Sequence, residues 1–160
     1  MRIREYTPED LNQLVELTID TFGPFYEDSF RPLVGEVVFA NEHGDWRGDY
    51  RRQVPALHDP GAGKHVAVAE DDGALAGYVG WDIDLERRHG NVEMLAVASS
   101  HRRSGTGRLL CEHAFADMRR RGIEVATIGT GGDVFHAPAR AFYSSLGCTE
   151  MPISVFYKQL

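Results

Sequence analysis

The sequence contains few cysteines and no long apolar run, and both deficits narrow the kind of protein that it encodes. Its two cysteines, Cys111 and Cys148, lack the spacing of metal ligands, so we expect buried, reduced thiols. No run of about 18 apolar residues is present, and the start of the chain lacks the apolar core of a signal peptide. Neither membrane insertion nor secretion is indicated, and we expect a cytoplasmic protein.

Metal ligands and repeats are also scarce. The seven histidines are scattered, without a His-x-x-x-His spacing or clustered carboxylates beside them, so no metal site is expected. No internal repeat or low-complexity tract interrupts the chain. With 160 residues and 42% hydrophobic content, the sequence predicts one globular domain over residues 1–160, burying roughly 70% of its unfolded surface.

The charge is unevenly distributed along the chain. The net charge is −7, yet residues 1–100 hold 19 acids and 9 bases, whereas residues 101–160 hold 5 acids and 8 bases. A more basic second part suits an anionic cofactor, and an acidic first part suits a cationic partner such as a polyamine, an amino sugar or a basic peptide rather than nucleic acid. The alternative is that the acids serve only to keep the protein in solution.

Hydrophobic periodicity predicts alternating strands and helices, and hence an α/β or α+β sheet with covering helices. Thr7 is the expected cap of the first helix, and the second helical stretch is expected to break at Pro32 and Gly35. Strands are expected over residues 1–6, 66–69, 75–81, 92–97, 123–128 and 153–158, and helices over residues 8–20, 26–42, 46–57, 106–121 and 138–146.

A glycine-rich turn lies between the strand and the helix that together cover residues 92–121. Glycines at a helix start let a ligand approach the backbone, and the amides there carry partial positive charge toward an anion. The spacing Arg-x-x-Gly-x-Gly differs from the dinucleotide fingerprint and from the P-loop. The turn predicts a phosphate-binding loop formed by Arg102, Arg103, Ser104, Gly105, Thr106, Gly107 and Arg108.

A second motif covers residues 136–148, a short helix with the pattern Ala-x-x-x-Tyr-x-x-x-Gly. In this order along the chain, the two motifs resemble those of the GNAT superfamily of acyl-CoA-dependent N-acetyltransferases. The resemblance implies a mixed, mostly antiparallel sheet whose central strands splay apart to admit the pantetheine of acetyl-CoA. It also implies cofactor contacts beyond the glycine turn, at Leu95, Ala96, Val97, His136, Ala139 and Tyr143.

Two residues are candidates for the proton transfers that acetylation of an amine requires. The resemblance places Tyr143 beside the cofactor sulfur, where a phenol with a pKa near 10 can donate a proton to a departing thiolate. Glu93 lies in the strand that would hold the thioester, and regular alternation would put it on the face of Leu95 and Val97. Its carboxylate can accept the amine proton through water; the alternative is an ion pair within the fold.

His136 stands where many similar proteins carry asparagine, and Cys148 stands where an aromatic residue is usual. His136 is either a hydrogen-bonding partner of pantetheine, a base near neutral pH or a helix cap. Asp133, in the preceding glycine-rich loop, either contacts the substrate or only ends the strand. Glu93, His136 and water therefore remain alternative bases.

An insert over residues 22–59 lies where similar proteins build acceptor specificity. It combines aromatic side chains with carboxylates, which can hold a cation by stacking and charge. Glu27, Trp46 and Asp49 are the candidate substrate contacts, although most of the aromatic residues can equally serve to pack short helices.

These observations predict a cytoplasmic acyltransferase that moves an acetyl group directly from acetyl-CoA to a small cationic amine. An aminoglycoside antibiotic is the sharpest candidate for that amine, which would make the protein a resistance enzyme. Acetylation of a protein amino terminus or lysine is one alternative, and a non-catalytic acyl-CoA sensor is another. Homodimers are common among similar proteins, and no membrane or nucleic-acid partner is expected.

Overall fold

The computed structural model describes residues 1–160 and divides them into two compact units. The first contains residues 1–21 and 47–128, and the second contains residues 22–46 and 129–160. The predicted insert, residues 22–59, is shared between them, since only residues 22–46 belong to the second unit. The single domain over residues 1–160 stays a prediction.

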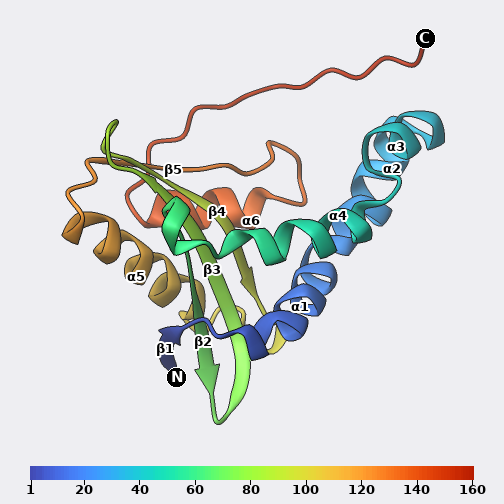
Figure 1. Ribbon diagram of the computed structural model, residues 1–160. Helices are drawn as coiled ribbons and strands as arrows, with labels where there is room; N and C mark the ends of the chain where they lie inside the picture. Colours follow the sequence, from blue (N-terminus) through green and yellow to red (C-terminus); the bar gives the residue numbers. More distant parts are fainter. The chain divides into compact units, whose positions relative to one another are not determined.

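All of the strands belong to the first unit, where they form one five-stranded sheet in the order β1-β2-β3-β4-β5 (Figure 1). Neighbouring strands run antiparallel except β4 and β5, which are parallel. The predicted mixed, mostly antiparallel sheet is confirmed. The strands are β1 (Arg2–Glu5), β2 (Lys64–Asp71), β3 (Ala74–Asp84), β4 (His89–Val97) and β5 (Val125–Ile128).

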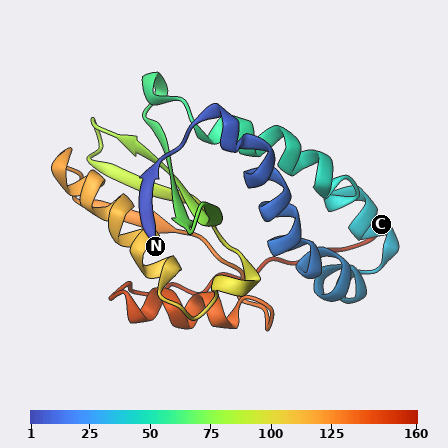
Figure 2. The ribbon, with the colours of Figure 1, turned by 90° about the horizontal axis from the view of Figure 1, so that it is seen from below.

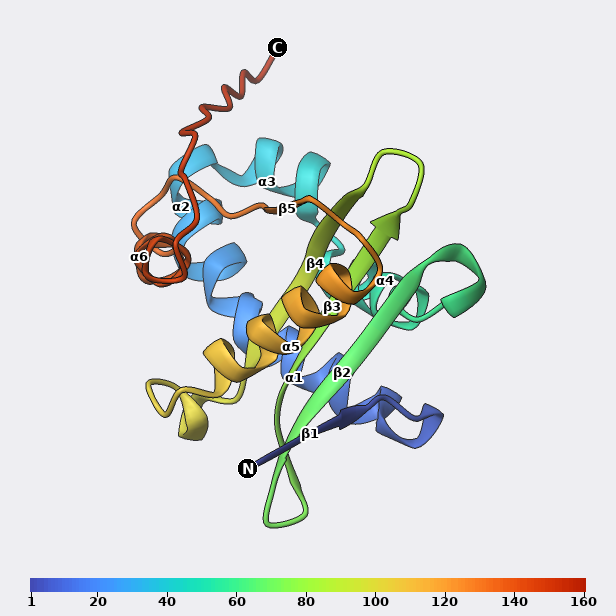
Figure 3. The same cartoon turned by 90° about the vertical axis from the view of Figure 1, so that its left-hand side faces the viewer.

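Helices cover both faces of this sheet. On one face lies α5 (Thr106–Arg120), as Figure 3 shows. It packs through Leu110, Ala114 and Met118 onto the apolar side chains of β2, β3 and β4. On the other face lies α1 (Leu11–Pro24), as Figure 2 shows. There the buried hydroxyl groups of Thr18 and Tyr78 are 2.5 Å apart, and burial raises the pKa of the Tyr78 phenol.

The remaining helices of the first unit are short. Residues 46–57 were expected as one helix, but the structure ends α4 at Gln53 and continues as a 3-10 turn in which Pro55 is the second residue. The missing proline N–H is tolerated there. These short elements are η1 (Pro8–Asp10), α4 (Trp46–Gln53), η3 (Val54–Leu57), η4 (Pro60–Ala62) and η5 (Ser99–His101).

The second unit is built from helices and irregular segments. The predicted break at Pro32 is absent, because Pro32 lies in the first turn of α2, where a proline is compatible with a helix. The break at Gly35 is confirmed: its φ is 81° and it separates α2 from α3. The helices here are the π-helix η2 (Phe25–Phe30), α2 (Arg31–Val34), α3 (Glu36–His43) and α6 (Ala137–Ser145). No helix of the chain combines the length and hydropathy that crossing a bilayer requires.

Two expectations for the end of the chain were wrong. Residues 153–158 form no strand; their alternating apolar pattern has no ladder partner in the second unit, which contains no other strand, and a strand depends on such pairing. Cys148 is exposed rather than buried, whereas Cys111 is a buried free thiol as expected.

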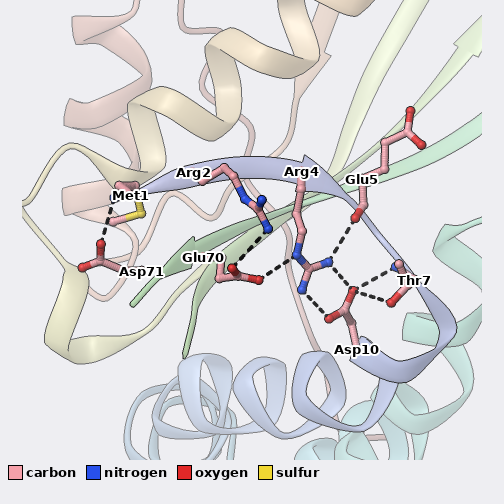
Figure 4. A network of polar contacts seen from close by, with 8 residues as sticks. All are labelled: Met1, Arg2, Arg4, Glu5, Thr7, Asp10, Glu70 and Asp71. Atoms are coloured by element: carbon pink, nitrogen blue, oxygen red, sulfur yellow. Dashed lines mark hydrogen bonds and ion pairs between the residues drawn. The ribbon is translucent and has the colours of Figure 1, made fainter. Parts of the chain in front are cut away.

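A polar network anchors β1 to the start of α1 (Figure 4). The Arg4 guanidinium donates two hydrogen bonds of 2.8 Å to the Asp10 carboxylate and one of 2.8 Å to Glu70. Asp10 also accepts a 2.8 Å hydrogen bond from the Thr7 backbone N–H, which completes the predicted cap. The hydrogen bonds from Arg4 lower the pKa of Asp10 although the carboxyl is buried.

Substituting Asp10→Asn should therefore lower the free energy of unfolding by about 2 kcal/mol at neutral pH. Because the folded pKa is depressed, the contribution of Asp10 is present above its unfolded pKa of about 3.9 and is lost as the pH falls through the folded value. Urea unfolding between pH 3 and pH 7 measures the difference, with Asp20→Asn, an exposed position on α1, as the control. An equal loss in both variants would contradict this account.

Candidate functional site

The loop between β4 and α5 turns sharply at two residues with positive φ. Arg103 has φ 62°, and Gly105, the residue that caps α5, has φ 88°. A side chain at Gly105 would meet no protein atom within 4 Å, so the space beside this backbone is open. Left-handed backbone and an open approach are what a loop that holds an anion requires.

Hydrogen bonds fix the shape of this loop. The Ser104 hydroxyl donates to the His101 carbonyl at 2.6 Å and lies 2.8 Å from the hydroxyl of Thr106, which is buried. The first hydrogen bond of α5 runs from the Leu109 N–H to the Gly105 carbonyl. The amides of the preceding turn, including that of Gly107, therefore precede the helical ladder and can face a ligand.

The arginines of the loop supply positive charge at its surface. Arg102, Arg103 and Arg108 are all exposed. Arg102 also donates a 3.4 Å hydrogen bond from Nε to the Val97 carbonyl, which links the loop to the end of β4. The predicted loop residues are thus gathered by the structure at one end of the sheet.

β4 is paired with β3 along most of its length but with β5 only at its start. The parallel register joins residues 89–92 to residues 125–128, and no strand lies beside residues 93–97 on that side. Backbone groups of Leu95, Ala96 and Val97 therefore border the point where β4 and β5 separate. Backbone N–H and C=O groups at such an edge can pair with an extended ligand.

A β-bulge changes the predicted orientation of Glu93. The register steps from Gly80 opposite Met94 to Trp81 opposite Val92, so Glu93 has no partner residue on β3. The extra residue reverses the alternation. Leu95 and Val97 pack with the core beneath α5, whereas Glu93 faces Lys64 and Asp82 on the opposite side. The expectation that Glu93 shares a face with Leu95 and Val97 was wrong.

Glu93 belongs to a row of polar side chains that crosses four strands. Its carboxylate lies 3.6 Å from the Lys64 ammonium and near the Asp82 carboxyl, which acts on its pKa. Asn91 donates a 3.3 Å hydrogen bond to Asp82, and Thr127 donates one of 3.2 Å to Asn91. Burial, followed by the Asp82 carboxyl, raises the pKa of Glu93, while Lys64 opposes the shift. Sequence reasoning missed Lys64, Asp82 and Asn91, because only the sheet register brings them together.

The second unit contains a tightly held histidine at the start of α6. His136 Nδ1 lies 2.6 Å from the Asp133 carboxylate, and a side chain at Gly131 would collide with both groups. Arg140 donates hydrogen bonds of 2.6 and 2.7 Å to the Gly131 and Asp133 carbonyls. Asp133 is desolvated, but its bond with His136 nevertheless lowers the pKa of Asp133.

Ala139 and Tyr143 follow on α6, one turn apart, so their side chains share a face of the helix. Both are half-buried, and the Tyr143 ring lies 5.4 Å from that of Phe142. This placement fits either a packing residue or a phenol that reaches a ligand, as the sequence indicated.

The three candidate acceptor contacts do not belong to one unit. Trp46 is buried and stacks on Tyr26, and its indole N–H donates a 3.1 Å hydrogen bond to Glu27 in the second unit. Asp49 lies in the first unit, where it is exposed and pairs with Arg52 at 2.5 Å. Burial of the Trp46 ring favours the packing alternative for that residue.

The residues of the first unit fit a ligand that carries both amides and a pyrophosphate. The open backbone at Gly105 and the arginines beside it match the phosphates, and the edge of β4 matches the amides. No group of three or more His, Cys, Asp or Glu side chains is arranged to hold a metal ion.

A mixed sheet that opens beyond Val92, followed by a left-handed turn at a helix start, defines an α/β class of protein with helices on both faces of the sheet. The chain belongs to the acetyltransferase (GNAT) family, whose family model matches residues 12–148. This confirms the family predicted from the two motifs. Members of the family are acyltransferases that use acetyl-CoA.

One curated protein and two solved structures that are similar to this chain are also N-acetyltransferases by name. An uncharacterized N-acetyltransferase, YsnE of Bacillus subtilis, is 31% identical over 64 residues, which cover 40% of this chain and only 42% of that protein. The aminoglycoside antibiotic 6'-N-acetyltransferase AAC(6')-IG of Acinetobacter haemolyticus has a TM-score of 0.67 at 17% identity, covering 100% of this chain and 99% of that one. The PaiA N-acetyltransferase of Thermoplasma acidophilum, solved with coenzyme A, has a TM-score of 0.66 at 15% identity, covering 91% and 87%. At these identities the two structures share the fold.

The open backbone at Gly105 generates a prediction with a matched control. Gly105→Ala and Gly122→Ala both place a side chain at positive φ in open space, one at each end of α5. Each should cost about 1 kcal/mol of stability, but only Gly105→Ala should weaken binding of coenzyme A, by about tenfold or more. Calorimetric titration with coenzyme A, alongside urea unfolding, measures both quantities. Equal affinities for the two variants would remove the phosphate assignment.

Proposed function

We propose that this protein transfers the acetyl group of acetyl-CoA to a primary amine of a small cationic molecule, with an aminoglycoside antibiotic as the sharpest candidate. The observation that carries the proposal is the unpaired edge of β4 that leads directly into the left-handed turn at Gly105. An extended backbone edge and an anion loop, joined in one segment, suit the two chemical parts of coenzyme A.

The chain's own residues would hold this cofactor. Backbone C=O groups of Leu95, Ala96 and Val97 would accept hydrogen bonds from its amides, and their N–H groups would donate to the amide oxygens. The loop from Arg102 to Arg108 would bind its phosphates. In the second unit, His136, Ala139 and Tyr143 are the further contacts that the family resemblance implies. Acetyl-CoA supplies the activated acetyl group, which passes directly to the amine without an acyl-enzyme.

Proton transfer defines the roles of the two catalytic candidates. Removing a proton from an amine of pKa near 10.4 at pH 7 costs about 4.6 kcal/mol, so a strongly basic acceptor gains from a nearby carboxylate. Glu93 would take that proton at its carboxylate through water. Tyr143 would donate its phenol proton to the departing sulfur, because a neutral phenol is a proton donor at this pH.

The acceptor is inferred from charge. The carboxylates Glu27, Asp49 and Asp133 are the candidate acceptor contacts, and carboxylates attract cations. The aminoglycoside acetyltransferase that shares this fold makes an aminoglycoside a suitable member of the panel below. We assign the reaction to the cytoplasm, with the protein as a monomer or homodimer.

The function is tested by thiol release from acetyl-CoA with a panel of aminoglycosides, polyamines, amino acids and basic peptides, with mass detection of the products. Turnover confined to an aminoglycoside is expected and would identify a resistance-type enzyme. Turnover of peptides alone would instead favour protein acetylation. Tight binding of acetyl-CoA without turnover of any amine in the panel would contradict the proposed acceptor and favour the sensor.

The role of Tyr143 has its own test. Tyr143→Phe removes only the phenol oxygen and should lower kcat about 100-fold, the usual contribution of a general acid, with the affinity for acetyl-CoA almost unchanged. Tyr157→Phe makes the same chemical change at an exposed tyrosine of the second unit that contacts Phe30, and should leave kcat as it is. If both variants turn over normally, Tyr143 is not the acid.

A further inference from the structure

The polar row around Glu93 contains two groups with opposite effects on one carboxyl. We infer that Asp82 and Lys64 are positioning residues for Glu93. Asp82 stabilises the protonated carboxyl of Glu93 after proton transfer, and Lys64 stabilises the carboxylate of Glu93 before proton transfer. The inference rests on the proposed role of Glu93 and deepens it, since it says which neighbours set the pH range in which Glu93 accepts a proton.

The bulge in β4 is the first step of the argument. Lys64, Asp82 and Asn91 lie in register on β2, β3 and β4, so their side chains share one face of the sheet. Without the extra residue, Glu93 would lie on the opposite face, with the apolar core beneath α5. The bulge puts its carboxyl on the face of Asp82 and within 3.6 Å of the Lys64 ammonium.

Asp82 is held in place from its other side. Thr127 on β5 donates to the Asn91 side-chain oxygen, and the Asn91 amide donates to Asp82 Oδ2. These bonds fix the Asp82 carboxylate on the face of the sheet that also holds Glu93. A half-buried carboxyl that already accepts an amide hydrogen bond suits the role of acceptor for a proton carried by Glu93.

Lys64 approaches Glu93 from β2 at 3.6 Å, and the two side chains are 35% and 25% exposed. Partial exposure keeps Glu93 accessible to water, which the proton must cross. The charged groups that face Glu93 are therefore Lys64 from β2 and Asp82 from β3. One favours the charged carboxylate and the other disfavours it.

The proton transfer balances without any further reactant. The N–H bond of the acceptor amine breaks, the proton crosses water, and an O–H bond forms on the Glu93 carboxylate. That O–H then donates to Asp82, which removes the repulsion between two adjacent carboxylates. Loss of the proton to solvent, with the carboxylate again beside Lys64, restores the starting state.

The pH profile of kcat/KM with the amine found in the panel tests this pair. Asp82→Asn should move the acidic limb to lower pH and raise kcat/KM on that limb about tenfold, whereas Lys64→Met should move it to higher pH and lower kcat/KM there about tenfold. Asp84→Asn, an exposed carboxylate of β3 that accepts only the Arg87 N–H, should leave the limb in place. A purely structural role would not shift the limb in opposite directions.

Carbon NMR of the glutamate carboxyls, with the Glu93 signal assigned by its loss in Glu93→Gln, separates this inference from the proposed function. The Glu93 titration midpoint should fall in Asp82→Asn and rise in Lys64→Met. Midpoints that do not move overturn the inference, whatever the activity. If the midpoints move in these directions but Glu93→Gln turns over normally, the inference about Asp82 and Lys64 is supported. The same result would overturn the proposed role of Glu93 as the base.

Discussion

The pairing of β4 is the constraint on which the site depends. On one side β3 holds this strand along most of its length, while on the other side β5 pairs with it only as far as Val92. Backbone hydrogen-bonding groups must find partners, so the part of β4 beyond Val92 is suited to a ligand that behaves as a further strand. The loop that follows places the start of α5, with its left-handed cap at Gly105, after the end of the same strand.

The bulge at Glu93 gives the two faces of β4 different characters. Before it, Val92 belongs to the core beneath α5; after it, Leu95 and Val97 return to that core. Only Glu93 itself is displaced to the polar face. One inserted residue thus places a carboxyl among charged partners without removing an apolar side chain from the core.

Much of this arrangement could be read from local sequence. Two glycines after a strand and before an amphipathic helix predicted the turn at Gly105, because few other residues adopt φ near 88° without strain. The same applies to α6, whose start at Ala137 follows from a proline in the first turn. The partners of Glu93 could not be predicted in this way, because Lys64 lies on β2 and Asp82 on β3. Only the pairing of these strands brings the two residues near Glu93.

The sequence by itself determined the family, the order of most elements and the position of the glycine turn before α5, because these depend on local propensity and on motifs within one segment. Only the tertiary structure decided which face Glu93 occupies and that residues 153–158 form no strand. It also decided that Trp46 is buried. Register, bulges and burial depend on contacts between distant segments, and a strand pattern becomes a strand only where a neighbouring backbone accepts its hydrogen bonds.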